Sequence, residues 1–135
     1  MRYKQNGMIL LNYTGEIVKL NQKKKNEKLT IKHPVLPNGR TSMILPPLGK
    51  ASVVSELKQE ATDVFPTMHY RVSGLPEPIP EAFFIVNNIV AKTLSRYRND
   101  LLILCEPKII KTKNLLKPDE VMLECSNFAH VLIEI

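Results

Sequence analysis

The stretch Gly74–Leu101, GLPEPIPEAFFIVNNIVAKTLSRYRNDL, carries the strongest structural signals in this chain of 135 residues. Its three prolines stiffen the approach to an apolar block, because each pyrrolidine ring fixes its own φ angle. The block is Ala82–Val90. Its first part, Ala82–Val86, favours a buried strand, and the apolar spacing then becomes helical over Asn87–Arg96. Asn87 or Asn88 is expected to cap this helix, since an asparagine oxygen can accept the free amide hydrogens of a first turn. The stretch therefore predicts a stiff turn, a strand and a helix in direct succession.

Short apolar segments separated by turn residues make up most of the remaining chain. Ten prolines suit this pattern, because proline is tolerated at turns and sheet edges. Thr14 and Gly15 are expected to join the first two strands in a hairpin. The pattern predicts a mainly β fold with one inserted helix, a small antiparallel Greek-key-like β-barrel or sandwich. The expected strands are Met8–Tyr13, Glu16–Leu20, Leu29–Lys32, Thr41–Leu45, Ala51–Glu60 (whose tail also tolerates a helix), His69–Ser73, Ala82–Val86, Leu101–Cys105, Lys108–Lys113, Val121–Cys125 and Ala129–Ile135.

Length and composition predict one domain over residues 1–135, with enough apolar residues, 44%, to form a core. The formal net charge is +6, and lysines crowd residues 19–28. That segment is expected to be an exposed loop, and a solubilising role is its simplest interpretation. No apolar run reaches membrane-spanning length, and the N-terminal run is too short for a signal peptide. We therefore expect a cytoplasmic protein with no membrane contact, whose cysteines, Cys105 and Cys125, remain thiols.

Catalytic and metal-binding patterns are missing from the sequence. The three histidines, His33, His69 and His130, are scattered, and none has the neighbouring groups that a nucleophile and its base require. The sequence contains no CxxC, HxH or HExxH spacing, and its five glycines form no phosphate-binding loop. The sequence predicts a protein that is not an enzyme and uses no metal or cofactor.

Binding of a small anionic ligand fits the residues around the helix better. Arginine suits phosphate because its planar fork matches two oxygens, aromatic faces can stack on a base, and asparagine can both donate to and accept from a base edge. Two alternatives stay open: one of the two phenylalanines can belong to the core, and the arginines can simply favour the negative end of the helix. The candidate ligand-binding residues are Arg71, Phe83, Phe84, Asn87, Asn88, Arg96, Arg98 and Asn99.

Several patches of the chain resemble a group of small phage and prophage proteins. The patches are GLPEP at Gly74–Pro78, FFIV at Phe83–Val86, IVA at Ile89–Ala91, RNDL at Arg98–Leu101, NYT at Asn12–Thr14 and PPLGKA at Pro46–Ala51. In these patches the chain is similar to the first family of Thoeris anti-defence proteins. The resemblance implies a Greek-key β-barrel core, homo-oligomers, and a phage protein in the host cytoplasm that sequesters cyclic ADP-ribose isomers without cleaving them. The chain departs from the family pattern at Asn87, where serine is usual, in its C-terminal turn, and in the lysine-rich segment.

The function that follows is sequestration of a small immune-signalling nucleotide, either a cyclic ADP-ribose isomer or a cyclic oligonucleotide. A protein–protein interaction module that inhibits a host protein is the alternative. Sequence-specific nucleic-acid binding is not indicated, because no helix-turn-helix, zinc spacing or RNA-binding aromatic pattern is present. Nonspecific nucleic-acid binding through the lysine-rich segments is a third, less favoured interpretation.

Overall fold

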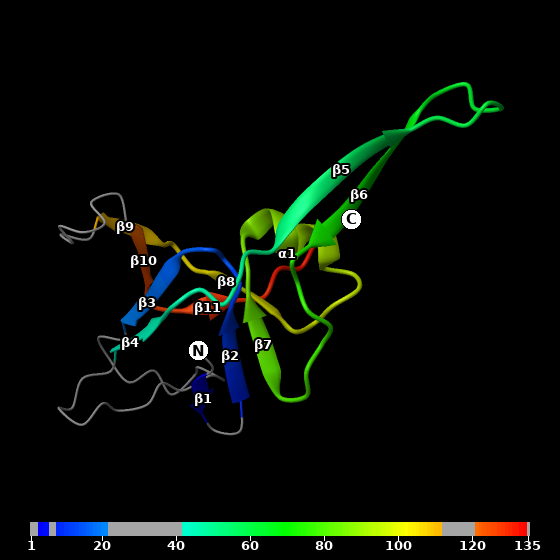
Figure 1. Ribbon diagram of the computed structural model, residues 1–135. Helices are drawn as coiled ribbons and strands as arrows, with labels where there is room; N and C mark the ends of the chain where they lie inside the picture. The colour runs from blue at the N-terminus through cyan, green and yellow to red at the C-terminus, as the bar shows by residue number, and fades with distance from the viewer. Residues whose placement is uncertain (1–2, 6–7, 22–41, 112–120, 135) are drawn as a thin grey trace.

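The computed structural model describes residues 3–5, 8–21, 42–111 and 121–134 (Figure 1). Within these residues the protein is mainly β with one helix, as the sequence predicts. The expected strand Leu29–Lys32 and most of the lysine-rich segment lie outside the described residues. The elements are β1 (Tyr3–Gln5), β2 (Met8–Asn12), β3 (Ile17–Asn21), β4 (Ser42–Leu45), β5 (Ser52–Lys58), β6 (Thr67–Ser73), β7 (Ala82–Ile85), α1 (Asn88–Leu94), β8 (Leu101–Leu104), β9 (Lys108–Lys111), β10 (Val121–Cys125) and β11 (Phe128–Ala129).

The strands form two larger sheets and a separate hairpin. One sheet has the order β1-β2-β7-β8-β11, the second has the order β4-β3-β10-β9, and β5 pairs with β6 alone. Within the described residues these sheets do not close into a barrel. They contain parallel as well as antiparallel pairs, whereas the sequence predicts antiparallel sheets. The parallel pairs are β2 with β7, β7 with β8, and β3 with β10. Apolar alternation predicts a strand but not its direction, and α1 provides the crossover that the parallel pair β7–β8 requires.

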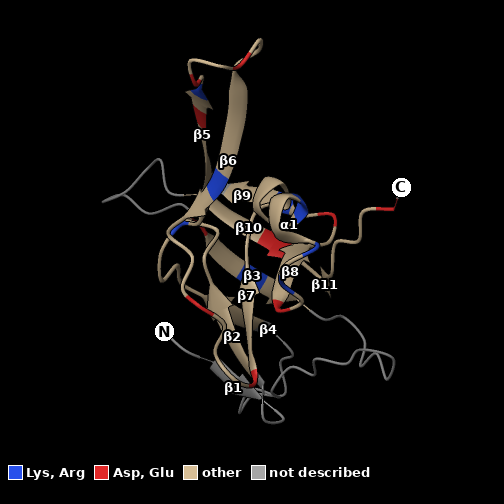
Figure 2. Ribbon diagram, turned by 90° about the vertical axis from the view of Figure 1, so that its right-hand side faces the viewer, with Lys and Arg blue, Asp and Glu red and all other residues tan. Residues whose placement is uncertain are grey.

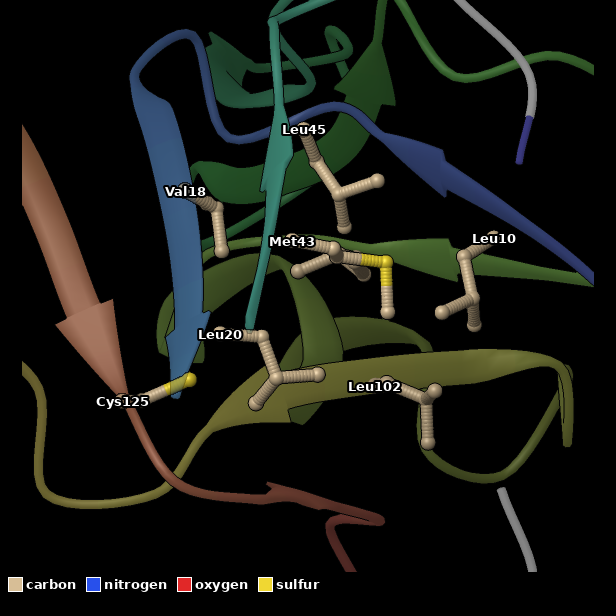
Figure 3. Close-up of a cluster of buried hydrophobic side chains, with 8 residues drawn as sticks. Leu10, Val18, Leu20, Met43, Leu45, Leu102 and Cys125 are labelled. Carbon is tan, nitrogen blue, oxygen red and sulfur yellow. The ribbon is translucent and has the colours of Figure 1, made fainter. Parts of the chain in front are cut away.

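The two larger sheets share one apolar core, which makes the sandwich the better description of this part of the fold. Figure 3 shows its side chains converging from strands of both sheets. Aliphatic side chains and one thiol fill this core, because the chain contains no tryptophan. Its buried members are Leu10, Val18, Leu20, Met43, Leu45, Ile85, Leu102 and Cys125.

The five-stranded sheet also buries its other face. Side chains alternate along each strand, so Leu11, Phe84 and Leu101 point away from the shared core. Helix α1 covers this second face with Val90 and Ala91, both buried. Within the described part of the chain, no helix has the length and apolar character needed to cross a membrane.

A buried polar corner connects the two sheets between β2 and β3. Asn12, 1% exposed, donates from Nδ2 to the carbonyl oxygens of Leu45 and Glu16, both at 2.8 Å. Its Oδ1 accepts from the amide and the hydroxyl of Thr14, at 3.0 and 2.7 Å. The expected β2–β3 hairpin at Thr14 and Gly15 is therefore wrong, because this corner directs the two strands into different sheets.

The hairpin β5–β6 extends away from the body of the protein (Figure 1). We call residues 52–73 the arm. Its strands confirm the expected β segments, and its base contacts α1. At the C-terminus the expected strand Ala129–Ile135 is wrong: only Phe128–Ala129 is a strand, and residues 130–134 are irregular. The apolar residues there do not pair with β8; Val131 instead packs against the core beneath α1.

Candidate functional site

Two hollows meet at Asn99, in the turn between α1 and β8. The helix-side hollow has a volume of about 280 Å³, and the proline-side hollow has about 450 Å³. The first lies between the end of α1 and the C-terminal segment. The second lies between the turn at Asn99 and Asp100 and the continuous segment that leads from the proline-rich turn into β7. Asn99 is exposed and lines both. The helix-side hollow also includes Ser95, Arg98 and His130, and the proline-side hollow includes Ile79, Phe83 and Asp100.

The turn that carries Asn99 is held in place at both ends. Helix α1 ends at Leu94, whose carbonyl oxygen accepts the amide of Arg98 at 2.9 Å. The Asp100 carbonyl oxygen accepts the amide of Phe84 at 2.8 Å, which ties the turn to β7. Asn99 thus stands on a fixed backbone with its side chain at the surface, the arrangement that suits a ligand contact.

Arg98 is engaged by the fold on three sides. Its Nε donates to Oδ1 of Asp100 at 2.9 Å, and Nη2 donates to Oδ2 at 2.7 Å. Its Nη1 donates to the Pro76 carbonyl oxygen at 2.7 Å, and the guanidinium carbon lies 5.2 Å from the centre of the Phe84 ring. Both partners of the ion pair have side chains only 13% exposed. Arg98 therefore borders the helix-side hollow as a structural residue, with its fork already filled by a carboxylate.

The two phenylalanines have different environments. Phe84 is completely buried, with Tyr13 at 5.4 Å between ring centres and Arg98 on the ring, so its face is not accessible to a base. Phe83 points the other way, is half-buried, and lines the proline-side hollow. Its ring centre lies 5.9 Å from that of His130. Phe84 therefore belongs to the core, which is the alternative that the sequence left open for one of the two phenylalanines.

His130 is a site residue that the sequence did not indicate. Its Nδ1 lies 3.2 Å from the carbonyl oxygen of Leu101. A carbonyl can only accept, so the proton is assigned to Nδ1, and Nε2 has no partner among the described residues. The pairing of β11 with β8 places His130 beside Leu101, although 29 positions separate them in the sequence. No local motif around His130 could have shown this.

The other four candidates do not line either hollow. Asn87 is the N-cap residue and makes no side-chain capping bond in the described structure, and Asn88 is exposed beside it. Both lie at the far end of α1 from Asn99, about 10 Å away along a helix of this length. Arg96 is exposed just after α1, and Arg71 is exposed on β6. Of the eight predicted residues, the structure brings together Phe83, Arg98 and Asn99.

The chemistry of the hollows suits holding a ligand by hydrogen bonds and apolar contact. Ser95 contributes a hydroxyl to the helix-side hollow, and its Oγ donates to the Lys92 carbonyl oxygen at 3.1 Å. That hydroxyl is paired with the helix rather than with His130, so the two do not form a nucleophile and base. Among the described residues, no three His, Cys, Asp or Glu side chains gather as a metal site would require.

Comparison of the chain with protein-family models, with curated proteins and with solved structures finds no match.

Proposed function

We propose that this protein binds a small phosphate-bearing nucleotide at the Asn99 hollows and sequesters it without cleaving it. The observation that carries the proposal is the position of Asn99, an exposed amide shared by two hollows. On one side His130 offers a ring nitrogen that has no partner within the described part of the chain, and on the other side Phe83 offers a half-buried ring. The role that fits, in line with the resemblance to Thoeris anti-defence proteins, is removal of an immune-signalling nucleotide from the host cytoplasm.

The ligand class follows from the kinds of group present. An amide can pair with a base edge as donor and acceptor together, and an aromatic edge can support the base or ribose. The volumes of 280 and 450 Å³ lie around the lower end of the roughly 300–1,000 Å³ of small-molecule sites. Lys92 is exposed on α1 and Arg96 is exposed just after it, and each is next in the sequence to a residue that lines the helix-side hollow, Ala91 and Ser95. Their charges supply the attraction for phosphate that the filled fork of Arg98 does not.

Retention without cleavage fits the hydrogen bonding around Ser95. Its hydroxyl is directed at the helix, and His130 donates its Nδ1 hydrogen to the backbone. The hollows therefore present hydrogen-bonding groups that need no change of covalent state to hold a ligand.

Thermal unfolding with a panel of cyclic ADP-ribose isomers and cyclic di- and trinucleotides tests the proposal. A ligand that binds only the folded state, at a concentration about 100 times its Kd, adds about 2.7 kcal/mol of stability and raises Tm. We expect the rise in the unmodified protein and in Asn88→Ala, whose exposed amide lies at the far end of α1. We expect it to be lost in Asn99→Ala. If no member of the panel raises Tm, or if Asn99→Ala responds as the unmodified protein does, the proposal is wrong.

A further inference from the structure

The arm is a two-faced ribbon. Strands β5 and β6 pair over seven residues, so alternate cross-strand pairs lie on opposite faces. One face is apolar except for a single serine, and it carries the pairs Val53–Val72, Ser55–Tyr70 and Leu57–Met68. The other face is polar or charged except for one valine, and it carries Val54–Arg71, Glu56–His69 and Lys58–Thr67.

Only the base of the apolar face is covered. Val53 and Val72 are half-buried against the core beneath α1, whereas every residue from 55 to 71 is exposed. The exposed fraction is 61% for Leu57, 45% for Met68 and 65% for Tyr70. In the turn at the tip, Val64 and Phe65 are exposed as well. Exposed apolar side chains that lie side by side are one mark of an interaction surface, and an isolated two-stranded hairpin is at best marginally stable in water.

The charge of the arm is opposite to that of the rest of the chain. Residues 52–73 carry three acidic and two basic side chains, whereas the remaining residues carry ten acidic and seventeen basic ones. Glu60 and Asp63 lie in the tip, where Figure 2 shows the acidic positions at the end of the arm. Asp63 accepts the Glu60 amide at 3.2 Å, so the tip is an ordered turn. A second copy of this chain is therefore a partner of complementary charge.

The outer face of the four-stranded sheet is a matching surface on that second copy. The register places Ile17, Met122 and Ile110 in one row across it. The next row contains Ile44, Lys19, Glu124 and Lys108. Ile44 is 57% exposed and Ile110 is 36% exposed. Lys19 lies 3.9 Å from Glu124, which leaves Lys108 as the excess cation of the row. This face is thus apolar with a positive edge.

We propose that the arm of one copy packs its apolar face on the outer face of the β4-β3-β10-β9 sheet of a second copy. The arm extends away from that sheet within one molecule (Figure 1), so a copy does not cover its own sheet in this way. In a dimer with two-fold symmetry, each arm packs on the sheet of the other copy. Both exposed surfaces are then covered in each copy, and the assembly is closed. This inference is independent of nucleotide binding.

The size of the contact predicts a dimer of moderate affinity. Seven-residue strands give an arm face about 23 Å long and 10 Å wide, and exchange of two arms buries four such faces, about 900 Å². This area lies below the roughly 1,200 Å² of standard stable interfaces. Association is therefore expected to depend on protein concentration in the micromolar range.

Sedimentation velocity on the full chain, from about 1 to about 100 µM, tests the proposal. Met68→Asp places a charge on the apolar face of the arm, and Thr67→Asp places the same charge on its polar face one residue away. Ile44→Asp places it on the sheet. We expect the unmodified protein and Thr67→Asp to dimerise alike, and Met68→Asp and Ile44→Asp to weaken the dimer at least about tenfold. All three substituted positions are exposed, and circular dichroism checks that each variant is folded.

Two results would overturn the proposal. One is an unmodified protein that stays monomeric to the highest concentration, which would assign the arm to a different partner such as a host protein. The other is a dimer that Met68→Asp leaves intact, or that Thr67→Asp weakens equally, because the apolar face of the arm would then not be the contact.

Discussion

The guanidinium of Arg98 donates two parallel hydrogen bonds to the carboxylate of Asp100, 2.9 Å from Nε to Oδ1 and 2.7 Å from Nη2 to Oδ2. The same guanidinium reaches the Pro76 carbonyl oxygen and lies on the Phe84 ring. The pair therefore joins the turn after α1, the proline-rich turn and β7. It also fixes the backbone on either side of Asn99.

Arg98→Ala is expected to destabilise the fold by about 3 kcal/mol, because it leaves the Asp100 carboxylate poorly exposed and unpaired. Arg96→Ala, two residues earlier and exposed, is expected to change stability by no more than about 0.5 kcal/mol. Urea unfolding of both variants measures the difference. Equal effects for Arg98→Ala and Arg96→Ala would show that the Arg98–Asp100 pair does not hold the turn.

The positions of most described strands could be predicted from local sequence, with β1 and the C-terminal strand as exceptions, whereas the partners of the strands could not. Val121–Cys125 matches β10 at both ends, because apolar spacing and flanking polar residues fix a strand locally. The direction of β7 relative to β8 depends on the crossover through α1, and the corner at Asn12 depends on Leu45, 33 positions away. Such contacts are set by packing between distant segments.

The site shows the same division. The position of an arginine near the end of a helix could be predicted from the sequence. Whether that arginine binds a ligand phosphate or a carboxylate of the protein depends on which anion the fold places beside it. Asp100, two positions after Arg98, fills the fork that a ligand phosphate would need. His130 joins the hollow only through the pairing of β11 with β8. Asn99 could be predicted as a candidate because an asparagine can both donate to and accept from a base edge, and its exposure is known only from the structure.

Two glycines allow a matched test of how the arm is connected to the rest of the protein. Gly74 and Gly15 both have φ of +83°, so alanine at either position costs about 1 kcal/mol in backbone strain. At Gly74 the added Cβ would also collide with the backbone carbonyl oxygen of Lys50, whereas at Gly15 it would meet the flexible Lys50 side chain at 2.8 Å. We expect Gly74→Ala to lower Tm clearly more than Gly15→Ala. Equal shifts would mean that Gly74 is needed for its φ angle alone.

Asn12→Ala removes the centre of the buried polar corner. The Leu45 carbonyl oxygen and the Thr14 hydroxyl would each lose a buried partner, and each such loss costs about 1–3 kcal/mol. A total near 3 kcal/mol is expected in urea unfolding, against no more than about 0.5 kcal/mol for Asn88→Ala, an exposed amide. A loss below 1 kcal/mol would show that water replaces the Asn12 side chain.

Cys125 predicts a loss of stability at alkaline pH. Burial raises the pKa of this thiol from 9.0 to about 11, despite an opposing hydrogen bond to the Asn127 backbone. The unfolded thiol ionises near pH 9 while the folded one stays protonated, so its contribution is complete below pH 9 and is lost as pH rises through about 11. Over this interval the free energy of unfolding of the unmodified protein is expected to fall by up to about 2 kcal/mol more than that of Cys125→Ala. Parallel pH profiles would contradict a protonated, buried thiol.

The most direct test of the central claim is recovery of an intact nucleotide from the protein. The unmodified protein, Asn99→Ala and Asn88→Ala are each incubated with cyclic ADP-ribose isomers, separated from free ligand by gel filtration and denatured by heat. Mass spectrometry then identifies the small molecule released. Uncleaved ligand is expected from the unmodified protein and Asn88→Ala, with about tenfold less from Asn99→Ala, the loss that removal of an amide pairing produces. No retained ligand, equal retention by Asn99→Ala, or release of a cleaved product would contradict the account.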